Sequence, residues 1–346
     1  MDKVLEKLVE QQELGVSAVV GTILTVEGSA YRREGARMLF LENGVQVGTL
    51  SAGCLETDVA CRAEAVLAAG KPAMHTYDTS SEDDLTWGRG AGCNGVITVL
   101  VEPLSWSAGT LATMYWSHVL RCYKDGLAGL TLRCTDAHSG ETVGFLIATE
   151  AGIIGTLGTP ARDDYWRTRM TQFDGAAGRT VSFRDGNEVI TLGRLTGRER
   201  VFIFGAGPDA EPMTEVLAQA GFAVTLVDHR PARLHPEYFS RAEAIIDCRP
   251  EQAALRLEIP TGSYAIVMTH SFQLDQVWVE FLLDKPLRYL GVLGPRLRTE
   301  RLVGQNPLPQ SVKSPIGLDI GADGPEEIAV SVAAELVQVR HASRSA

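Results

Sequence analysis

The sequence predicts an α/β protein of two domains, with a strand-rich α/β domain followed by a doubly wound parallel sheet. After a charged opening helix, the first half runs mainly through β-branched and apolar stretches such as "VSAVVGTILTV" and "VITVLVE". From about residue 199, short apolar stretches alternate with helical ones, which is typical of parallel strands joined by crossover helices. We place the boundary within residues 192–200 and the domains at 1–195 and 196–346.

Each element follows from its local pattern. Val4, Leu5, Leu8 and Val9 have helical spacing, Asn43-Gly44 between two apolar runs predicts a hairpin, and "CLETDVACRAEAVLAAG" predicts a helix with an acidic first turn. Further strands of the first domain are expected in "VITVLVE", "AGLTLRC", "GFLIAT" and the hairpin "RTVSFRDGNEVITL". In the second domain we expect strands at 201–204, 223–227, 244–246, 265–268 and 289–292, and a last helix that begins near Pro325.

Composition narrows the class of partner. The chain has 346 residues, of which 45% are hydrophobic and 22% charged, an ordinary globular composition. A net charge of −11 disfavours nucleic acid and anionic lipid, and no apolar run approaches the ~20 residues of a membrane span. The six cysteines form no CxxC pair and "MDKVLEKLVEQQE" does not resemble a signal peptide, so we expect reduced thiols and a cytoplasmic location.

The second domain begins with a glycine-rich turn, "VFIFGAGPDAEP", that is typical of Rossmann-like nucleotide sites. Gly205 permits a tight turn, and Gly207 has no Cβ to keep a diphosphate from the backbone and the helix N-terminus. Asp228 ends the next strand, where a carboxylate is expected to accept from a ribose hydroxyl. Pro208 and Pro212 fit only if the helix begins near Asp209. The alternative is a tightly packed βαβ turn that binds nothing.

Two glycine-rich turns in the first domain each carry one cysteine. "LSAGCLETD" contains Gly53, Cys54 and Glu56, and "WGRGAGCNGVITV" contains Gly92 and Cys93. Bare backbone N–H groups in such turns can form an anion nest, and a helix N-terminus lowers the pKa of a thiol such as Cys54. A thiolate is also a ligand for soft metals. The plain alternative is that both cysteines are small buried hydrophobic residues in tight turns.

Other polar residues lie at expected loop edges. Arg37, beside Arg32 and Arg33 in "EGSAYRREGARMLF", could hold a phosphate by bidentate bonds, or simply belong to a solvated turn. His270 follows a strand at the carboxyl edge of the parallel sheet, where ligands bind, although it could instead cap the next helix. Gly294 and Arg296 follow another strand at that edge and could hold an anion.

Seven motifs in order resemble the XdhC/CoxI family, the accessory proteins of xanthine dehydrogenase and carbon monoxide dehydrogenase maturation. They are "GSAYRREGARM", "SAGCLETDV", "GRGAGCNGVITVLVEP", "VFIFGAGPDAEP", "THSFQLD", "YLGVLGPRLRTERL" and "SPIGLDIGADGPEEIAVSVAAEL". The resemblance runs from about residue 16 to 340 and is weakest over 105–195. The sequence departs from it at Tyr31, Ala52 and Asn94, and at Pro208, where many relatives have histidine.

The resemblance implies a carrier of the molybdenum cofactor, as molybdopterin or its dinucleotide form, more than an enzyme. Such a protein would shelter the cofactor while a cysteine desulfurase supplies a sulfido ligand, and then deliver it to an apo molybdenum hydroxylase of the xanthine or carbon monoxide dehydrogenase type. Cys54 and Cys93, with Arg37, would meet the molybdenum end. The expected cofactor-binding residues are Arg37, Gly53, Cys54, Glu56, Gly92, Cys93, Gly205, Gly207, Asp228, His270, Gly294 and Arg296.

Two other functions remain open from the residues. In the first, the Rossmann-like turn binds NAD(P) and the protein is an NAD(P)-dependent oxidoreductase. In the second, it binds NAD(P) or another nucleotide and only changes the affinity of the chain for a partner. A homodimer is the expected oligomer for such a fold.

Overall fold

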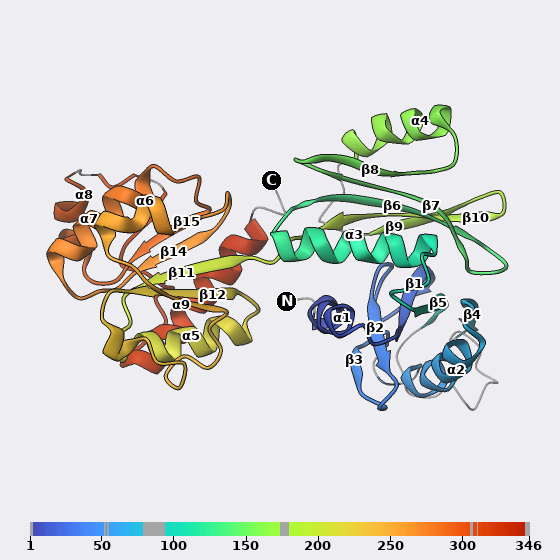
Figure 1. Cartoon of the computed structure of the whole chain (residues 1–346), viewed down its shortest axis with the longest axis horizontal. Helices are drawn as coiled ribbons and strands as arrows, with labels where there is room; N and C mark the ends of the chain where they lie inside the picture. The colour runs from blue at the N-terminus through green and yellow to red at the C-terminus, as the bar shows by residue number, and fades with distance from the viewer. Residues whose placement is uncertain are drawn as a thin grey trace. The chain divides into compact units, whose positions relative to one another are not determined.

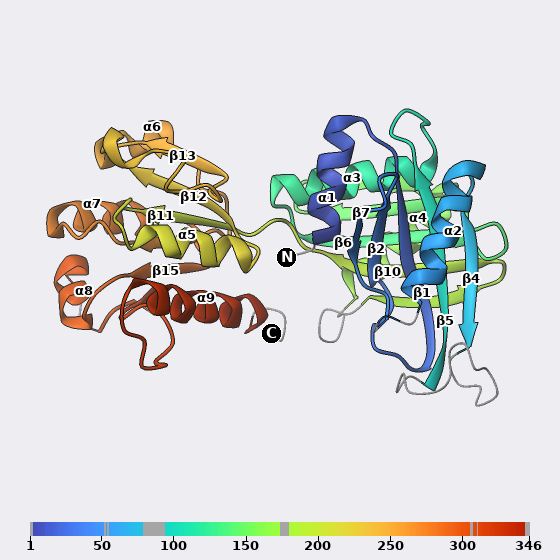
Figure 2. The same cartoon turned by 90° about the horizontal axis from the view of Figure 1, so that it is seen from below.

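The computed structural model describes residues 3–51, 53, 55–78, 94–173, 180–304, 307–309 and 311–342. The chain divides into two compact units, Asp2–Gly197 and Arg198–Ala346, close to the boundary that the change of pattern predicts. Among the described residues, no helix combines the length and apolar character that crossing a membrane requires. The predicted fold class is confirmed, because the first unit is strand-rich α/β and the second carries a parallel sheet (Figures 1 and 2).

The first unit is built on two antiparallel five-stranded sheets, in the orders β3-β2-β1-β5-β4 and β8-β7-β6-β10-β9. Its strands are β1 (Ala18–Ser29), β2 (Arg37–Leu41), β3 (Gln46–Gly48), β4 (Ala73–Asp78), β5 (Asn94–Leu104), β6 (Gly129–Asp136), β7 (Thr142–Thr149), β8 (Gly152–Thr156), β9 (Val181–Asp185) and β10 (Glu188–Leu195). Its helices are α1 (Lys3–Leu14), α2 (Glu56–Ala69), α3 (Leu111–Asp125) and α4 (Pro160–Thr171).

Helix α3 lies between the two sheets, while α2 and α4 cover their outer faces (Figure 1). No element is predicted at α3, whose sequence "LATMYWSHVLRCYKD" mixes helix formers such as leucine, alanine and methionine with aromatic and β-branched residues. Its ends are nevertheless well formed. The Thr110 hydroxyl accepts from the N–H of Thr113, and Gly126 takes the left-handed conformation with φ 75°. Burial of Trp116, Val119 and Leu120 between two apolar sheet faces stabilises the helix.

A buried ion pair joins the two sheets of the first unit. The Arg133 guanidinium, from β6, donates to both carboxylate oxygens of Glu102, from β5, at 2.7 and 2.5 Å. Trp116 of α3 donates to the same carboxylate at 3.0 Å, and Thr142 accepts from Arg133 at 3.0 Å. The side chains of Glu102 and Arg133 are 1% and 6% exposed, so their interaction is hardly screened by solvent.

The second unit has one six-stranded parallel sheet, ordered β13-β12-β11-β14-β15-β16. Its strands are β11 (Arg200–Phe204), β12 (Ala223–Asp228), β13 (Ala244–Asp247), β14 (Tyr264–Val267), β15 (Tyr289–Val292) and β16 (Val312–Lys313). Its helices are α5 (Ala210–Gln219), α6 (Ala253–Arg256), α7 (Phe272–Leu283), α8 (Arg296–Val303) and α9 (Pro325–Ala342). Helices α5 and α9 cover one face, and α6, α7 and α8 the other (Figure 1). The strand order reverses between β11 and β14, where ligands of such sheets bind.

Replacing Arg133 with methionine should destabilise the first unit by about 3–5 kcal/mol, because it leaves the Glu102 carboxylate buried and unpaired. The double variant Glu102→Gln, Arg133→Met keeps an acceptor for Trp116 without the charge, so it should recover much of that loss. Urea unfolding followed by tryptophan fluorescence measures both variants. A loss below about 1 kcal/mol for the single variant would mean that the pair behaves like an exposed salt bridge.

Candidate functional site

The segment between β3 and α2, which carries the first predicted cysteine, is held by the Glu56 carboxylate. This group accepts from the N–H groups of Leu50 and Ser51 at 3.1 and 2.8 Å and from the Ser51 hydroxyl at 2.5 Å. The Ser51 hydroxyl oxygen in turn accepts from the N–H groups of Gly53 and Leu55, at 3.2 and 3.0 Å. Gly53 has φ 112°, a conformation in which other residues are strained. Hydrogen bonds therefore join the described residues on either side of position 54.

Glu56 serves this turn as a clamp. Partial burial raises the pKa of its carboxyl group, but the hydrogen bonds from Ser51 and Leu50 outweigh it and lower the pKa. Both carboxylate oxygens are used by the turn itself. The structure thus shows that Glu56 positions the backbone of the turn. Its predicted role in binding a cofactor stays a prediction.

Arg37 does not face α2. Met38, the next residue of β2, packs in the core cluster that contains Leu55 and Val59, while Leu39 packs on the opposite face with α1 and α3. Strand residues alternate between faces, so Arg37 belongs with Leu39. Its guanidinium lies 5.1 Å from the ring centre of Trp116 in α3, a cation–π contact. The structure therefore does not bring Arg37 to the face of the sheet on which the Glu56 turn lies.

Three predicted site residues, Cys54, Gly92 and Cys93, lie outside the described residues. The strand that follows Cys93 is described, and its first residue, Asn94, pairs with Ser29 at the end of β1. A Cβ on Gly95 would press on the backbone of Glu27 and Ser29, so glycine is needed for this close pairing. Within the described part of the chain, no three His, Cys, Asp or Glu side chains gather as a metal site would require.

The Rossmann turn of the second unit, residues 205–210, has the predicted glycine geometry. Gly205 has φ 117°, and a Cβ there would lie 2.5 Å from the carbonyl oxygen of Met268 on the neighbouring loop. Helix α5 begins after Asp209, as the two prolines require, but the Asp209 side chain makes no capping hydrogen bond. It turns back over Gly207, where a Cβ would run into its Oδ1 atom. A carboxylate thus fills the space that a diphosphate would need.

Asp228 at the end of β12 is bonded within the chain. Its Oδ2 atom accepts from the N–H of Ala206 at 2.7 Å, and Arg230 donates to both carboxylate oxygens at 2.7 and 2.9 Å. Burial raises the pKa of this carboxyl group, but Arg230 and the Ala206 N–H outweigh burial and lower it. Asp228 is therefore ionised and 5% exposed beside a cavity of only about 140 Å³. A ribose hydroxyl would have to compete with Arg230 for it.

A side-chain hydrogen bond bridges the two loops at the point where the strand order reverses. His270 Nε2, after β14, lies 2.7 Å from Asp209 Oδ2, after β11. His270 has φ 61°, and no other non-glycine residue of the described ranges has a positive φ. It does not cap α7, because the Ser271 hydroxyl accepts from the N–H of Leu274. Such strain at a ligand-binding edge is typical of functional residues.

A cavity of about 630 Å³ opens beside this bridge, at the carboxyl edge of the sheet. Loops after β11, β14, β15 and β16 line it together with α5 and the start of α9. Its walls are mostly apolar, with Met213, Met268, Leu293, Ile316 and Ile328, and the predicted residues His270 and Gly294 also line it. We call it the α5/α9 cavity.

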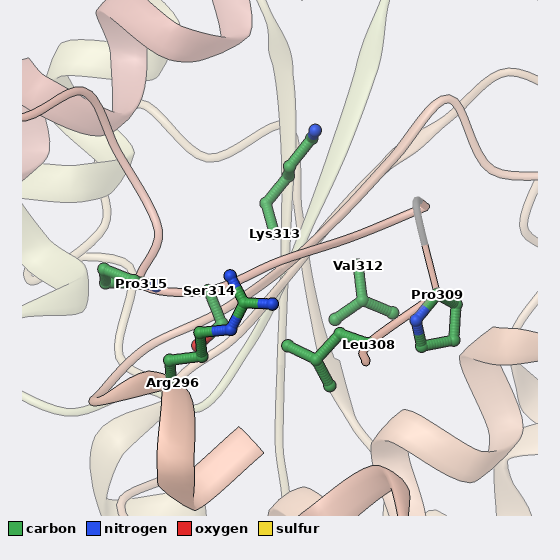
Figure 3. A pocket seen from close by; sticks show the side chains of 7 residues that line it. All are labelled: Arg296, Leu308, Pro309, Val312, Lys313, Ser314 and Pro315. Carbon is green, nitrogen blue, oxygen red and sulfur yellow. The ribbon is translucent and has the colours of Figure 1, made fainter. Parts of the chain in front are cut away.

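Arg296 lies outside that cavity, in a neighbouring one of about 480 Å³ that it lines with Lys313 and Ser314 (Figure 3). Arg296 donates to Glu300 at 3.1 Å and remains 58% exposed. In Figure 3 the Lys313 amino group points away from the Arg296 guanidinium. The two cations therefore do not converge on one anion, and Gly294 and Arg296 border different cavities.

The comparisons with known proteins agree with this architecture. The family model described as the XdhC and CoxI family matches residues 11–78, and the one described as the XdhC Rossmann domain matches residues 201–336. A Bacillus subtilis (strain 168) protein, named as a probable xanthine dehydrogenase subunit, is 38% identical over 336 residues, 97% of this chain and 96% of that protein. The chain belongs to the XdhC and CoxI family.

Two further relatives of this XdhC and CoxI protein match different shares of the chain. The crystal structure of a xanthine dehydrogenase from Bacillus halodurans matches 98% of this chain and 96% of that one, with 35% identity and a TM-score of 0.78. The uncharacterized protein YqeB of Escherichia coli (strain K12) is 28% identical over 153 residues, 42% of this chain and 28% of that protein. This chain thus shares its fold, over nearly its whole length, with the Bacillus halodurans protein.

Sequence reasoning missed Asp209 as part of the site and used it only as the start of a helix. One signal was available, since a carboxylate two residues after Gly207 places negative charge where a phosphate-binding loop avoids it. The partnership with His270 gave no signal, because 61 residues separate the two in sequence.

Glu56→Gln should lower the free energy of unfolding at pH 7 by about 1 kcal/mol, because neutral hydrogen bonds replace charged ones. The folded state lowers the pKa of Glu56, so its contribution is present above the unfolded-state pKa of about 4.3 and is lost as the pH falls through the folded-state pKa. Urea unfolding of both proteins between pH 3 and 7 should show the difference shrinking at low pH. Exposed Glu64→Gln on the same helix is the control; a difference that persists unchanged at low pH would contradict the clamp.

Proposed function

We propose that this protein acts in the maturation of a xanthine dehydrogenase-type molybdenum hydroxylase, as a carrier of its molybdenum cofactor. One observation supports this most: the chain matches, over nearly its whole length, relatives whose names refer to xanthine dehydrogenase. The carrier shelters the cofactor, presents it to a cysteine desulfurase and delivers it to the apo hydroxylase. This assigns it to purine breakdown inside the cell.

The first unit supports a place for the molybdenum end. Glu56 and Ser51 bind the described backbone on either side of position 54, next to the first turn of α2. A thiolate at Cys54 would gain from the positive end of that helix. Cys93 immediately precedes β5 and is the second candidate. The molybdenum ion of the bound cofactor is thiophilic, which suits both thiols.

The second unit, taken by itself, has a cavity that could hold an organic ligand. The α5/α9 cavity is within the size range of small-molecule sites, and its walls are largely apolar with a few polar groups at one edge. Asp209 and His270 supply that polar edge. The cavity thus suits an apolar organic group better than a bare anion.

The rival function is an NAD(P)-dependent oxidoreductase, which the strand order and the glycines of the Rossmann turn favour. Two contacts weigh against it. The Asp209 carboxylate fills the space beside Gly207, and Arg230 holds both oxygens of Asp228. A dinucleotide would therefore meet negative charge at its diphosphate and a competitor at its ribose.

Anaerobic mixing with freshly released molybdenum cofactor, followed by gel filtration, tests the carrier function. We expect molybdenum and pterin fluorescence to co-elute with the protein in about one-to-one ratio, and to be lost in Cys54→Ala or Cys93→Ala because a thiolate ligand is removed. Exposed Cys61 of α2 gives the matched control, and Cys61→Ala should still carry cofactor. If Cys54→Ala and Cys93→Ala both carry cofactor as well as the parent does, the thiols do not meet the molybdenum.

Titration with NADH and NADPH tests the rival. We expect no saturable change in nucleotide fluorescence, because Asp209 occupies the approach to Gly207. Saturable binding that Asp228→Ala weakens, together with absence of molybdenum cofactor from the protein peak, would replace the carrier function with hydride chemistry.

A further inference from the structure

Four of the residues that line the α5/α9 cavity are prolines exposed to solvent, and each comes from a different segment of the second unit. Pro208 precedes α5, Pro295 precedes α8, Pro315 follows β16 and Pro325 begins α9. A proline has a fixed φ and no backbone N–H, so these segments form a preshaped apolar rim with few hydrogen-bond donors. A preshaped surface loses little conformational entropy when another surface packs on it.

Two large apolar side chains near this proline rim are also exposed. Leu297, in the first turn of α8, is 71% exposed, and Ile320, in the loop between β16 and α9, is 55% exposed. Leu297 follows the lining residue Pro295 by two positions, and Ile320 lies between the lining residues Ile316 and Gly324. A single exposed apolar side chain is ordinary, but a group of them around an apolar cavity is typical of a protein interface. We call the proline rim with Leu297 and Ile320 the apolar patch.

The α8 side of the apolar patch is basic. Arg296 and Lys313 line the neighbouring cavity of about 480 Å³, and Pro315 of the rim lines both cavities (Figure 3). Arg301 is exposed one helical turn after Leu297, on the same face of α8. In a chain with a net charge of −11, this side of the patch thus carries the minority charge.

The α9 side of the apolar patch is acidic. Asp319 and Asp323 are exposed in the loop before α9, and Glu326 is exposed in the first turn of that helix. The last two flank Gly324 and Pro325, which line the α5/α9 cavity. Helices α8 and α9 cover opposite faces of the sheet, so the basic and the acidic groups lie on different sides of the patch.

An apolar patch with opposite charges on its two sides is complementary to a second copy of itself. A twofold axis through the patch brings the basic side of each copy against the acidic side of the other, while the apolar side chains meet between them. A partner of uniform negative charge would pair with the basic side but be repelled by the acidic side. The distribution of charge therefore favours a second copy of this chain as the occupant.

We propose that the carboxyl edge of the second unit is a homodimer interface, in which the α8 side of each copy meets the α9 side of the other. Leu297 of each copy then packs on the proline rim of the other copy, and both cavity mouths are covered. The fold class gives only the expectation of a dimer, whereas the apolar patch and its charges give the surface. The proposal uses the second unit alone and does not depend on the carrier function.

Sedimentation velocity of the full chain tests the apolar contact. We expect the parent to form a species of twice the mass of one chain, and Leu297→Glu to raise the dissociation constant at least about tenfold, because it buries a carboxylate against prolines. Leu255→Glu is the matched control, since Leu255 is 92% exposed in α6, which follows β13 at the opposite end of the sheet from β16. It should dimerise like the parent. A parent that is monomeric at about 100 μM, or a folded Leu297→Glu variant that dimerises like the parent, would overturn the proposal.

Two charge-reversed chains test the twofold pairing. One carries Arg301→Glu and Lys313→Glu, which makes both sides of the patch acidic, and the other carries Asp323→Lys and Glu326→Lys, which makes both sides basic. Each should be monomeric alone, because both contacts become repulsive, while a one-to-one mixture should form a dimer that added salt weakens. Circular dichroism and thermal unfolding check that each chain is folded. A dimer of either folded variant alone, or no dimer in the mixture, would contradict the proposed arrangement.

Discussion

The buried ion pair between Glu102 and Arg133 is the constraint on which the first unit depends. It joins β5 of one sheet to β6 of the other, and Trp116 of the intervening helix donates to it. A buried pair is costly to desolvate, so its value lies less in net stability than in allowing one arrangement of the sheets, in which every charge has its partner. Strand β5 is also the strand that follows Cys93. The ion pair thus holds the strand that directly follows Cys93, one of the two cysteines of the predicted thiol site.

In the second unit, a few side chains change what a Rossmann-like sheet edge can bind. Its strand order, its tight turn at Gly205 and its carboxylate at the end of β12 are those of a dinucleotide site. Yet Arg230 satisfies the β12 carboxylate, and Asp209 brings negative charge over Gly207. Fold alone therefore argues for nucleotide binding, while these two side chains argue against a diphosphate at the turn and a ribose at Asp228.

Much of the fold could be predicted because it rests on local signals. The turn at Asn43-Gly44, the left-handed end of α2 at Gly70 and the alternation after residue 199 are each written in a few neighbouring residues. Helix α3 is missed in the sequence analysis, although Thr110 at its start and Gly126 after its end are local signals of a helix. The Asp209–His270 bridge was also hidden, because a contact between two loops depends on strand order. Arg37 lies in the predicted strand, but the face of the sheet to which its side chain points depends on how that strand pairs with its neighbours.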